Sequence, residues 1–132
     1  MFPEKVMVEA SGEFKPGLAV ALTFKSKVKN DFHYTAFLSD DGRAEIGKEE
    51  LLEEFDQSRN FFLMDFGDPR IVFTGQIEAR IWGRKNVEKA METYLKFKSQ
   101  WKYKPDYFDN LQKALVSNEK SNCVITIRQV PQ

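Results

Sequence analysis

The chain has little of the residue types on which most recognisable sites depend. It holds one cysteine and one histidine in 132 residues. One thiol cannot form an internal disulfide, so the cysteine content gives no sign of an oxidising compartment. Structural zinc sites take four ligands, mostly cysteine and histidine, and Cys123 with His33 cannot supply them. We therefore expect neither a metal nor another cofactor.

Sequence motifs for common catalytic chemistry are also missing. The seven glycines are scattered and form neither a dinucleotide-binding loop nor a phosphate-binding loop. None of the serines lies in a GxSxG elbow. These absences favour a protein without catalytic activity. A carboxylate-based active site around Asp65 and Asp68 is kept as an alternative.

Long hydrophobic runs are absent as well. No apolar stretch approaches the roughly 20 residues that a membrane-spanning helix needs. The start of the chain, MFPEK, lacks the basic and then apolar pattern of a secretory leader. We expect a cytoplasmic protein with no membrane partner. A leader removed ahead of Met1 would leave secretion open.

The chain contains enough apolar residues to form one hydrophobic core. Hydrophobic residues make up 42% of the sequence, and 12 phenylalanines offer much apolar area to bury. A length of 132 residues is typical of one domain, so we treat residues 1–132 as a single domain.

Residue periodicity predicts that the N-terminal part of the chain is rich in strands. Alternation of apolar and polar residues predicts strands over 5–11, 18–27, 32–39, 44–46 and 71–82. The nearly continuous apolar stretch 60–66 predicts a further, central strand. A short helix is predicted over 47–58, because Leu51, Leu52 and Phe55 form an apolar stripe.

In the C-terminal part of the chain the spacing of apolar residues changes to that of helices. Asn86 is a candidate cap for a helix over 86–102, and Pro105 suits the first turn of a second helix. A last strand over 123–130 would return to the sheet, and one arrangement places it beside 71–82. The sequence thus predicts an α+β fold. It has an antiparallel sheet or sandwich, a short helix in the first half, two C-terminal helices and a final strand.

Residues 17–66 resemble a transthyretin-like, or prealbumin-like, β-sandwich domain. The similarity lies in LAVALTFKSK, in FHYTAFLS and in the turn DDGRA, which a short strand and a small helix follow. The resemblance implies a β-sandwich. The hydrolases of that family need several histidines, an arginine and a C-terminal tyrosine motif. This chain has only His33 and lacks that tail, so the resemblance does not imply their activity.

Two single residues have a reactive and a structural interpretation. His33 could act as a general base or as a pH-sensitive contact. No orienting partner is evident, which favours an ordinary strand residue. Cys123 would need a lowered pKa to act as a nucleophile, whereas its place at the start of an apolar strand favours a buried thiol.

Acidic residues gather in three places. Asp40 with Asp41, and Asp65 with Asp68, could offer oxygen ligands to a cation, but neither pair matches a calcium-binding loop, and turn formation explains them. A third group, Glu49, Glu50, Glu53 and Glu54, is spaced for one side of a helix. It is read either as a solvated face or as an acidic docking surface.

The segment 96–104 interleaves lysines with aromatic residues, which is suited to phosphates and stacked bases. Phe97 and Trp101 are four residues apart, which also fits a buried helical stripe. The isoelectric point near 6.6 argues against a nucleic-acid partner, and we do not expect one.

The charge is divided between the two halves of the chain. Residues 1–68 carry 8 Lys and Arg against 14 Asp and Glu, and residues 69–132 carry 12 against 6. This division and the many aromatic residues favour a protein-protein interaction module, such as an inhibitor, an immunity-type protein or an assembly subunit. Self-association is left open.

The alternative function is the binding of a small ligand in an aromatic-lined pocket between the sheet and the C-terminal helices. The side chains that we select as candidate binding residues are His33, Arg80, Trp82, Trp101 and Tyr103.

Overall fold

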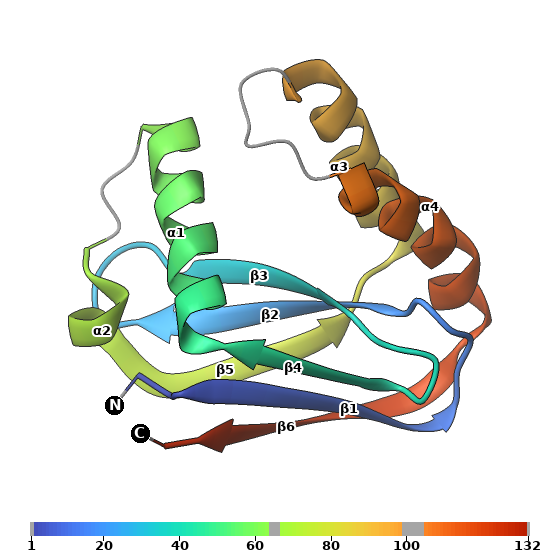
Figure 1. Cartoon of the computed structure of the whole chain (residues 1–132), viewed down its shortest axis with the longest axis horizontal. Helices are drawn as coiled ribbons and strands as arrows, with labels where there is room; N and C mark the ends of the chain where they lie inside the picture. The colour runs from blue at the N-terminus through green and yellow to red at the C-terminus, as the bar shows by residue number, and fades with distance from the viewer. Residues whose placement is uncertain (1, 64–66, 99–104, 132) are drawn as a thin grey trace.

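The computed structural model describes residues 2–63, 67–98 and 105–131, and Figure 1 shows the arrangement of their helices and strands. In chain order these are β1 (Lys5–Glu13), β2 (Ala19–Ser26), β3 (Phe32–Phe37), β4 (Arg43–Gly47), α1 (Lys48–Phe62), α2 (Pro69–Val72), β5 (Phe73–Ile81), α3 (Arg84–Phe97), α4 (Pro105–Lys120) and β6 (Asn122–Val130). The α+β fold class with two late helices and a final strand is confirmed.

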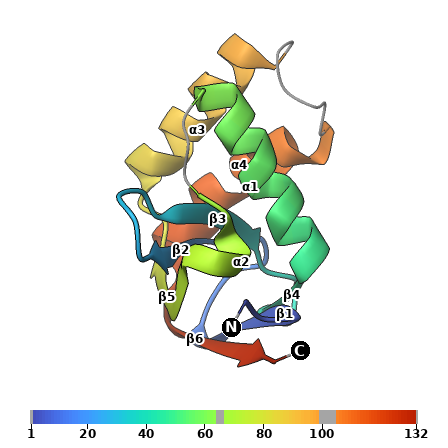
Figure 2. The ribbon, with the colours of Figure 1, turned by 90° about the vertical axis from the view of Figure 1, so that its left-hand side faces the viewer.

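The strands form two antiparallel three-stranded sheets, with the orders β4-β1-β6 and β3-β2-β5. In the end-on view of Figure 2 they curve around a common interior, with β5 and β6 as neighbours at one side. There the side-chain amide of Gln129 donates to the carbonyl of Gly75 over 2.8 Å. At the other side α1 packs against both β3 and β4 and covers the gap between the two sheets.

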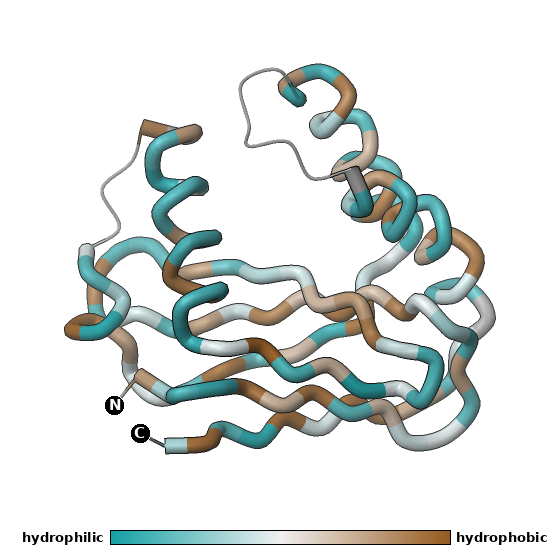
Figure 3. The backbone as a smooth tube through the Cα atoms, viewed as in Figure 1, coloured by the Kyte–Doolittle hydropathy of each residue, from teal (hydrophilic) through white to brown (hydrophobic). Residues whose placement is uncertain are grey.

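Strand alternation decides which side chains enter this interior. Along β6 half-buried residues alternate with exposed ones, and from Ile125 to Arg128 the half-buried residues are apolar and the exposed ones polar. Figure 3 shows how hydrophobic and hydrophilic residues are distributed along the strands. Val6 and Val8 of β1 face Val20 and Leu22 of β2 within one buried cluster. Period-two patterning therefore explains how each sheet presents one apolar face to the other.

Phenylalanines dominate the centre of the core. The ring of Phe24 lies 5.3 Å from that of Phe55 and 5.6 Å from that of Phe73, measured between centroids. Phe55 also contacts Phe32 at 5.1 Å. Because Phe55 belongs to α1 and the others to strands, this aromatic cluster fixes α1 against the sheets.

The α3–α4 pair packs on one end of the outer face of the β3-β2-β5 sheet. Its contact is a second buried cluster of Ala19, Val87, Leu111 and Ala114. The side chain of Asn118 accepts from the amide of Ala19 and donates to the carbonyls of Ala19 and Trp82, over 2.7–2.9 Å. These bonds tie α4 to the ends of β2 and β5.

The strand predicted over 60–66 is wrong. Residues up to Phe62 are the last turn of α1, and Leu63 ends the helix in the left-handed region at φ 53°. Residues 64–66 lie outside the described residues. A short apolar run fits a buried strand and a helix equally well, and the helix nucleated by Leu51 and Phe55 extends into this run as far as Phe62.

The starts of β5 and α3 also differ from the prediction. Pro69 opens the helical turn α2, capped by the Asp68 side chain, so β5 begins only at Phe73. The helix predicted from Asn86 begins at Arg84 with Gly83 at its cap, and residues 99–102 of its predicted range lie outside the described residues. The last strand lies beside β5, as one predicted arrangement had it, but its hydrogen-bonded partner over its whole length is β1.

None of the helices within the described ranges combines the length and the hydrophobicity that crossing a membrane requires.

We expect Phe55→Ala to lower the free energy of unfolding by about 3–5 kcal/mol, because it leaves a cavity between Phe24 and Phe32. Urea unfolding followed by circular dichroism measures this. The control is Ile71→Ala, since the Ile71 side chain is 71% exposed. Equal losses for the two variants would contradict the central role of the phenylalanine cluster.

Candidate functional site

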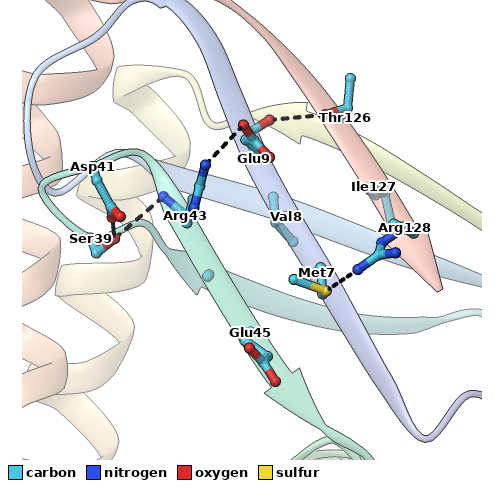
Figure 4. Close-up of a pocket in the computed structure, with 11 residues that line it drawn as sticks. Met7, Val8, Glu9, Ser39, Asp41, Arg43, Glu45, Thr126, Ile127 and Arg128 are labelled. Atoms are coloured by element: carbon cyan, nitrogen blue, oxygen red, sulfur yellow. Dashed lines mark hydrogen bonds and ion pairs between the residues drawn. The ribbon is translucent and has the colours of Figure 1, made fainter. Parts of the chain in front are cut away.

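The outer face of the β4-β1-β6 sheet carries a shallow depression of about 670 Å³ (Figure 4). Its charges are paired across strands: Arg43 lies 3.8 Å from Glu9, and Lys5 lies 2.7 Å from Glu45. Thr126 donates to the backbone carbonyl of Glu9 over 3.4 Å. Because acids and bases alternate on this face, we assign it no ligand.

A cleft of about 590 Å³ lies between α1, β3 and α4. Figure 1 shows α1 and α4 standing apart above β3. The volume is in the range of small-ligand sites. The side chains that line it come from all three segments: His33, Tyr34, Thr35, Phe37, Glu50, Glu53, Glu54, Asp106, Tyr107 and Asn110.

Carboxylates give the cleft its electrostatic character. Glu50, Glu53 and Glu54 are spaced three and four residues apart, which places them on one side of α1. Asp106, in the first turn of α4, adds a fourth carboxylate from the opposite wall. Among the described residues that line the cleft there is neither lysine nor arginine. The described lining of the cleft therefore carries a net negative formal charge.

Tyr34 links the strand to the acidic wall. Its hydroxyl donates to Oε1 of Glu50 over 2.8 Å. Burial, and after it the hydrogen bond to Glu50 and the charges of Glu50 and Glu54, raise the pKa of Tyr34 far above its ordinary value. This phenol therefore remains a hydrogen-bond donor at any physiological pH.

Tyr107 forms the aromatic part of the α4 wall. Its ring lies 5.9 Å from that of Phe37 and 5.6 Å from that of Tyr94. Burial, followed by the charge of Glu54, raises the pKa of Tyr107 to about 12. Glu54 thus influences the phenols on both sides of the cleft, which shows that the walls share one electrostatic environment.

A second depression, of about 480 Å³, lies on the outer face of the β3-β2-β5 sheet. It brings together three of the residues selected from the sequence, His33, Arg80 and Trp82, and adds Glu78 and Asn86. Trp101 and Tyr103, the other two, lie outside the described residues. His33 lines both this depression and the cleft, so the two sites adjoin.

His33 is exposed, and its Nδ1 lies 3.4 Å from the hydroxyl of Thr23 across the β2–β3 pair. This contact gives the ring a polar neighbour from the adjacent strand.

Burial raises the pKa of the half-buried Cys123 thiol, which argues against a nucleophilic role.

Two of the four aspartates considered as cation ligands, Asp41 and Asp68, have local partners. Asp41 accepts from the Ser39 hydroxyl, a bond that lowers the pKa of Asp41. Asp68 caps α2 and accepts from the guanidinium of Arg70, which lowers the pKa of Asp68. Asp65 lies outside the described residues. Within the described ranges no group of three or more His, Cys, Asp and Glu side chains is placed to hold a metal ion.

Sequence reasoning identified the glutamates of α1 as a possible docking surface but missed the opposite wall. Asp106, Tyr107 and Asn110 come from a helix more than fifty positions later in the chain. The helical spacing of Asp106 and Asn110 was a usable signal for one face of α4, but nothing in the sequence placed that face opposite α1.

No protein-family model, no curated protein and no solved structure matches this chain. The transthyretin-like resemblance of residues 17–66 therefore stays a prediction.

We expect the Tyr107 phenol to ionise only near pH 12, and Glu54→Gln to lower that pKa. The unfolded phenol ionises near pH ~10, so its contribution to stability is complete below pH 10 and is lost as the pH rises through 12. Ultraviolet absorbance titration detects the phenolate, and Tyr107→Phe identifies its signal. Glu45→Gln, on the other sheet, is the charge-matched control. An unchanged Tyr107 pKa in Glu54→Gln would contradict the shared electrostatic environment.

Proposed function

We propose that this chain is a non-catalytic binding module that recognises a cationic group of a partner molecule in the cleft between α1, β3 and α4. The observation that carries the proposal is the convergence of four carboxylates and two tyrosines around one space of about 590 Å³. As an interaction module it would serve as an inhibitor, an immunity-type protein or an assembly subunit.

The lining suits an ammonium or guanidinium group. Carboxylates on both walls supply opposite charge, and Tyr107 and Phe37 supply aromatic surface for cation–π contact. A cation entering the cleft would meet carboxylates of α1 and α4 at once, whereas the solvated face of an isolated helix offers only the carboxylates of that helix.

The same features support binding more than catalysis. A phenol whose pKa is raised holds its proton at neutral pH, so Tyr34 and Tyr107 act as hydrogen-bond donors and not as bases. The Tyr34–Glu50 hydrogen bond orients the carboxylate on the α1 wall. An oriented carboxylate is what recognition of a directional cation such as guanidinium requires.

A second candidate function is the binding of a small ligand on the neighbouring depression. The observation that favours it is the grouping of Arg80, Trp82 and Asn86 around one space of about 480 Å³. Arg80 would pair with an anionic group and Trp82 would offer a stacking surface. The two functions predict opposite ligand charges and different residues in contact.

We expect spermine, a tetracationic probe, to bind the cleft, with backbone amide shifts in two-dimensional NMR at Thr35, Glu54 and Tyr107. The double variant Glu54→Gln/Asp106→Asn should weaken binding about tenfold, which corresponds to ~1.4 kcal/mol. High salt should weaken binding by screening.

The matched control is the double variant Glu9→Gln/Glu45→Gln, which removes two carboxylates from the opposite sheet and should leave the affinity unchanged. Shifts centred on Arg80 and Trp82 would favour the second candidate function. If the two double variants lose affinity equally, spermine responds to net charge alone and the proposed cleft function is wrong.

A further inference from the structure

The floor of the cleft is the outer edge of β3, which pairs with no further strand among the described residues. Strand β2 occupies the other edge of β3, with Ala21 opposite Thr35. The cleft is lined by Tyr34, which faces the core, and by His33 and Thr35, which face outward. Successive side chains of a strand point to opposite faces of the sheet, so neither face alone presents both Tyr34 and its neighbours His33 and Thr35. A cleft lined by all three therefore lies at the edge of the strand.

The ladder between β2 and β3 shows which backbone groups point into the cleft. The amide of Leu38 donates to the carbonyl of Leu18, its direct partner in register, over 2.8 Å. Hydrogen-bonded pairs recur at every second residue of an antiparallel ladder, so Ala36 and Tyr34 also bond to β2. The backbone groups of His33, Thr35 and Phe37 therefore point away from β2.

These outward groups form a short template for a further strand. Within residues 2–63, 67–98 and 105–131, no hydrogen bond to the outward N–H and C=O groups of His33, Thr35 and Phe37 is made. From His33 to Phe37 the edge extends over roughly 14 Å, at about 3.4 Å per residue. Strand edges of this kind accept extended peptides through backbone hydrogen bonds.

The walls would select the side chains of such a peptide. A strand added to β3 points successive side chains to opposite sides. On one side lie Tyr34 and the α1 carboxylate bonded to it, and on the other lie Phe37 and the α4 residues Asp106 and Tyr107. Three of the four carboxylates belong to α1, so basic residues are favoured most strongly on the α1 side, and a peptide with basic residues at alternate positions is favoured in one orientation of its backbone.

We propose that the partner recognised by this module is an extended peptide segment rich in Lys or Arg, which adds as a strand to the free edge of β3 between α1 and α4. The inference rests on the proposed cation-binding function of the cleft. It adds the polypeptide nature of the ligand and its backbone pairing with Thr35 and its neighbours.

The first test uses a capped seven-residue peptide of alternating lysine and threonine, with binding measured by calorimetry. Two analogues carry N-methyl groups at either the odd or the even positions. N-methylation removes the amide donor without changing the charge. We expect one analogue to bind at least ~10-fold more weakly because its altered amides face β3, and the other, whose altered amides face solvent, to bind like the parent.

The second test changes the strand edge. Thr35→Pro removes an N–H that takes no part in the β2 ladder, and proline is tolerated at edges on such positions. We expect this variant to keep spermine binding and to lose the preference between the two methylated peptides. Thr35→Val is the matched control, since it keeps the N–H and the branched side chain. If Thr35→Pro fails to fold, the comparison of the two N-methylated peptides on the unchanged protein still tests strand addition.

The outcomes separate this inference from the function on which it rests. If spermine and all three peptides bind with no difference between the methylated forms, strand addition is wrong and cation binding stands. If neither spermine nor the parent peptide binds, the proposed function itself is wrong. Dimerisation in sedimentation that Thr35→Pro abolishes would make a second copy of this chain the occupant, which would also overturn the assignment of a separate basic peptide.

Discussion

The insertion of Phe55 among the strand phenylalanines is the contact on which the rest of the structure depends. It fixes α1 over the opening between β3 and β4, where two three-stranded sheets would otherwise expose their common core. Because α1 is fixed there, its glutamates stand beside β3 and do not face bulk solvent on all sides. The acidic wall of the cleft is thus a consequence of core packing.

The opposite wall depends on a separate polar contact. Asn118 bonds to the backbone at the ends of β2 and β5, and the small residues Ala19 and Ala114 let α4 approach the sheet closely. The first turn of α4 then projects over β3, where Asp106 and Tyr107 meet the α1 side. Two independent anchors, one aromatic and one polar, hold the two walls on either side of the β3 edge.

Much of the fold could be predicted from local pattern. Alternation located the strands other than the one wrongly predicted over 60–66, and helical spacing with Asn86 and Pro105 located both late helices to within a few residues. The failure at 60–66 has a physical cause: a short run of apolar residues satisfies a central strand and the end of a helix alike. The pairing of β6 with β1 was not readable either, because strand partners are chosen by long-range register and not by the sequence within a strand.

The sequence by itself determined the acidic face of α1, the sparing use of cysteine and histidine, and the alternation of β3, because each depends on neighbours a few residues apart. Only the tertiary structure decided that Glu54 approaches both Tyr34 and Tyr107, and that His33 adjoins Arg80 and Trp82. Those contacts join segments far apart in the chain. Their geometry is set by packing of the phenylalanine core and of Asn118, which no local pattern encodes.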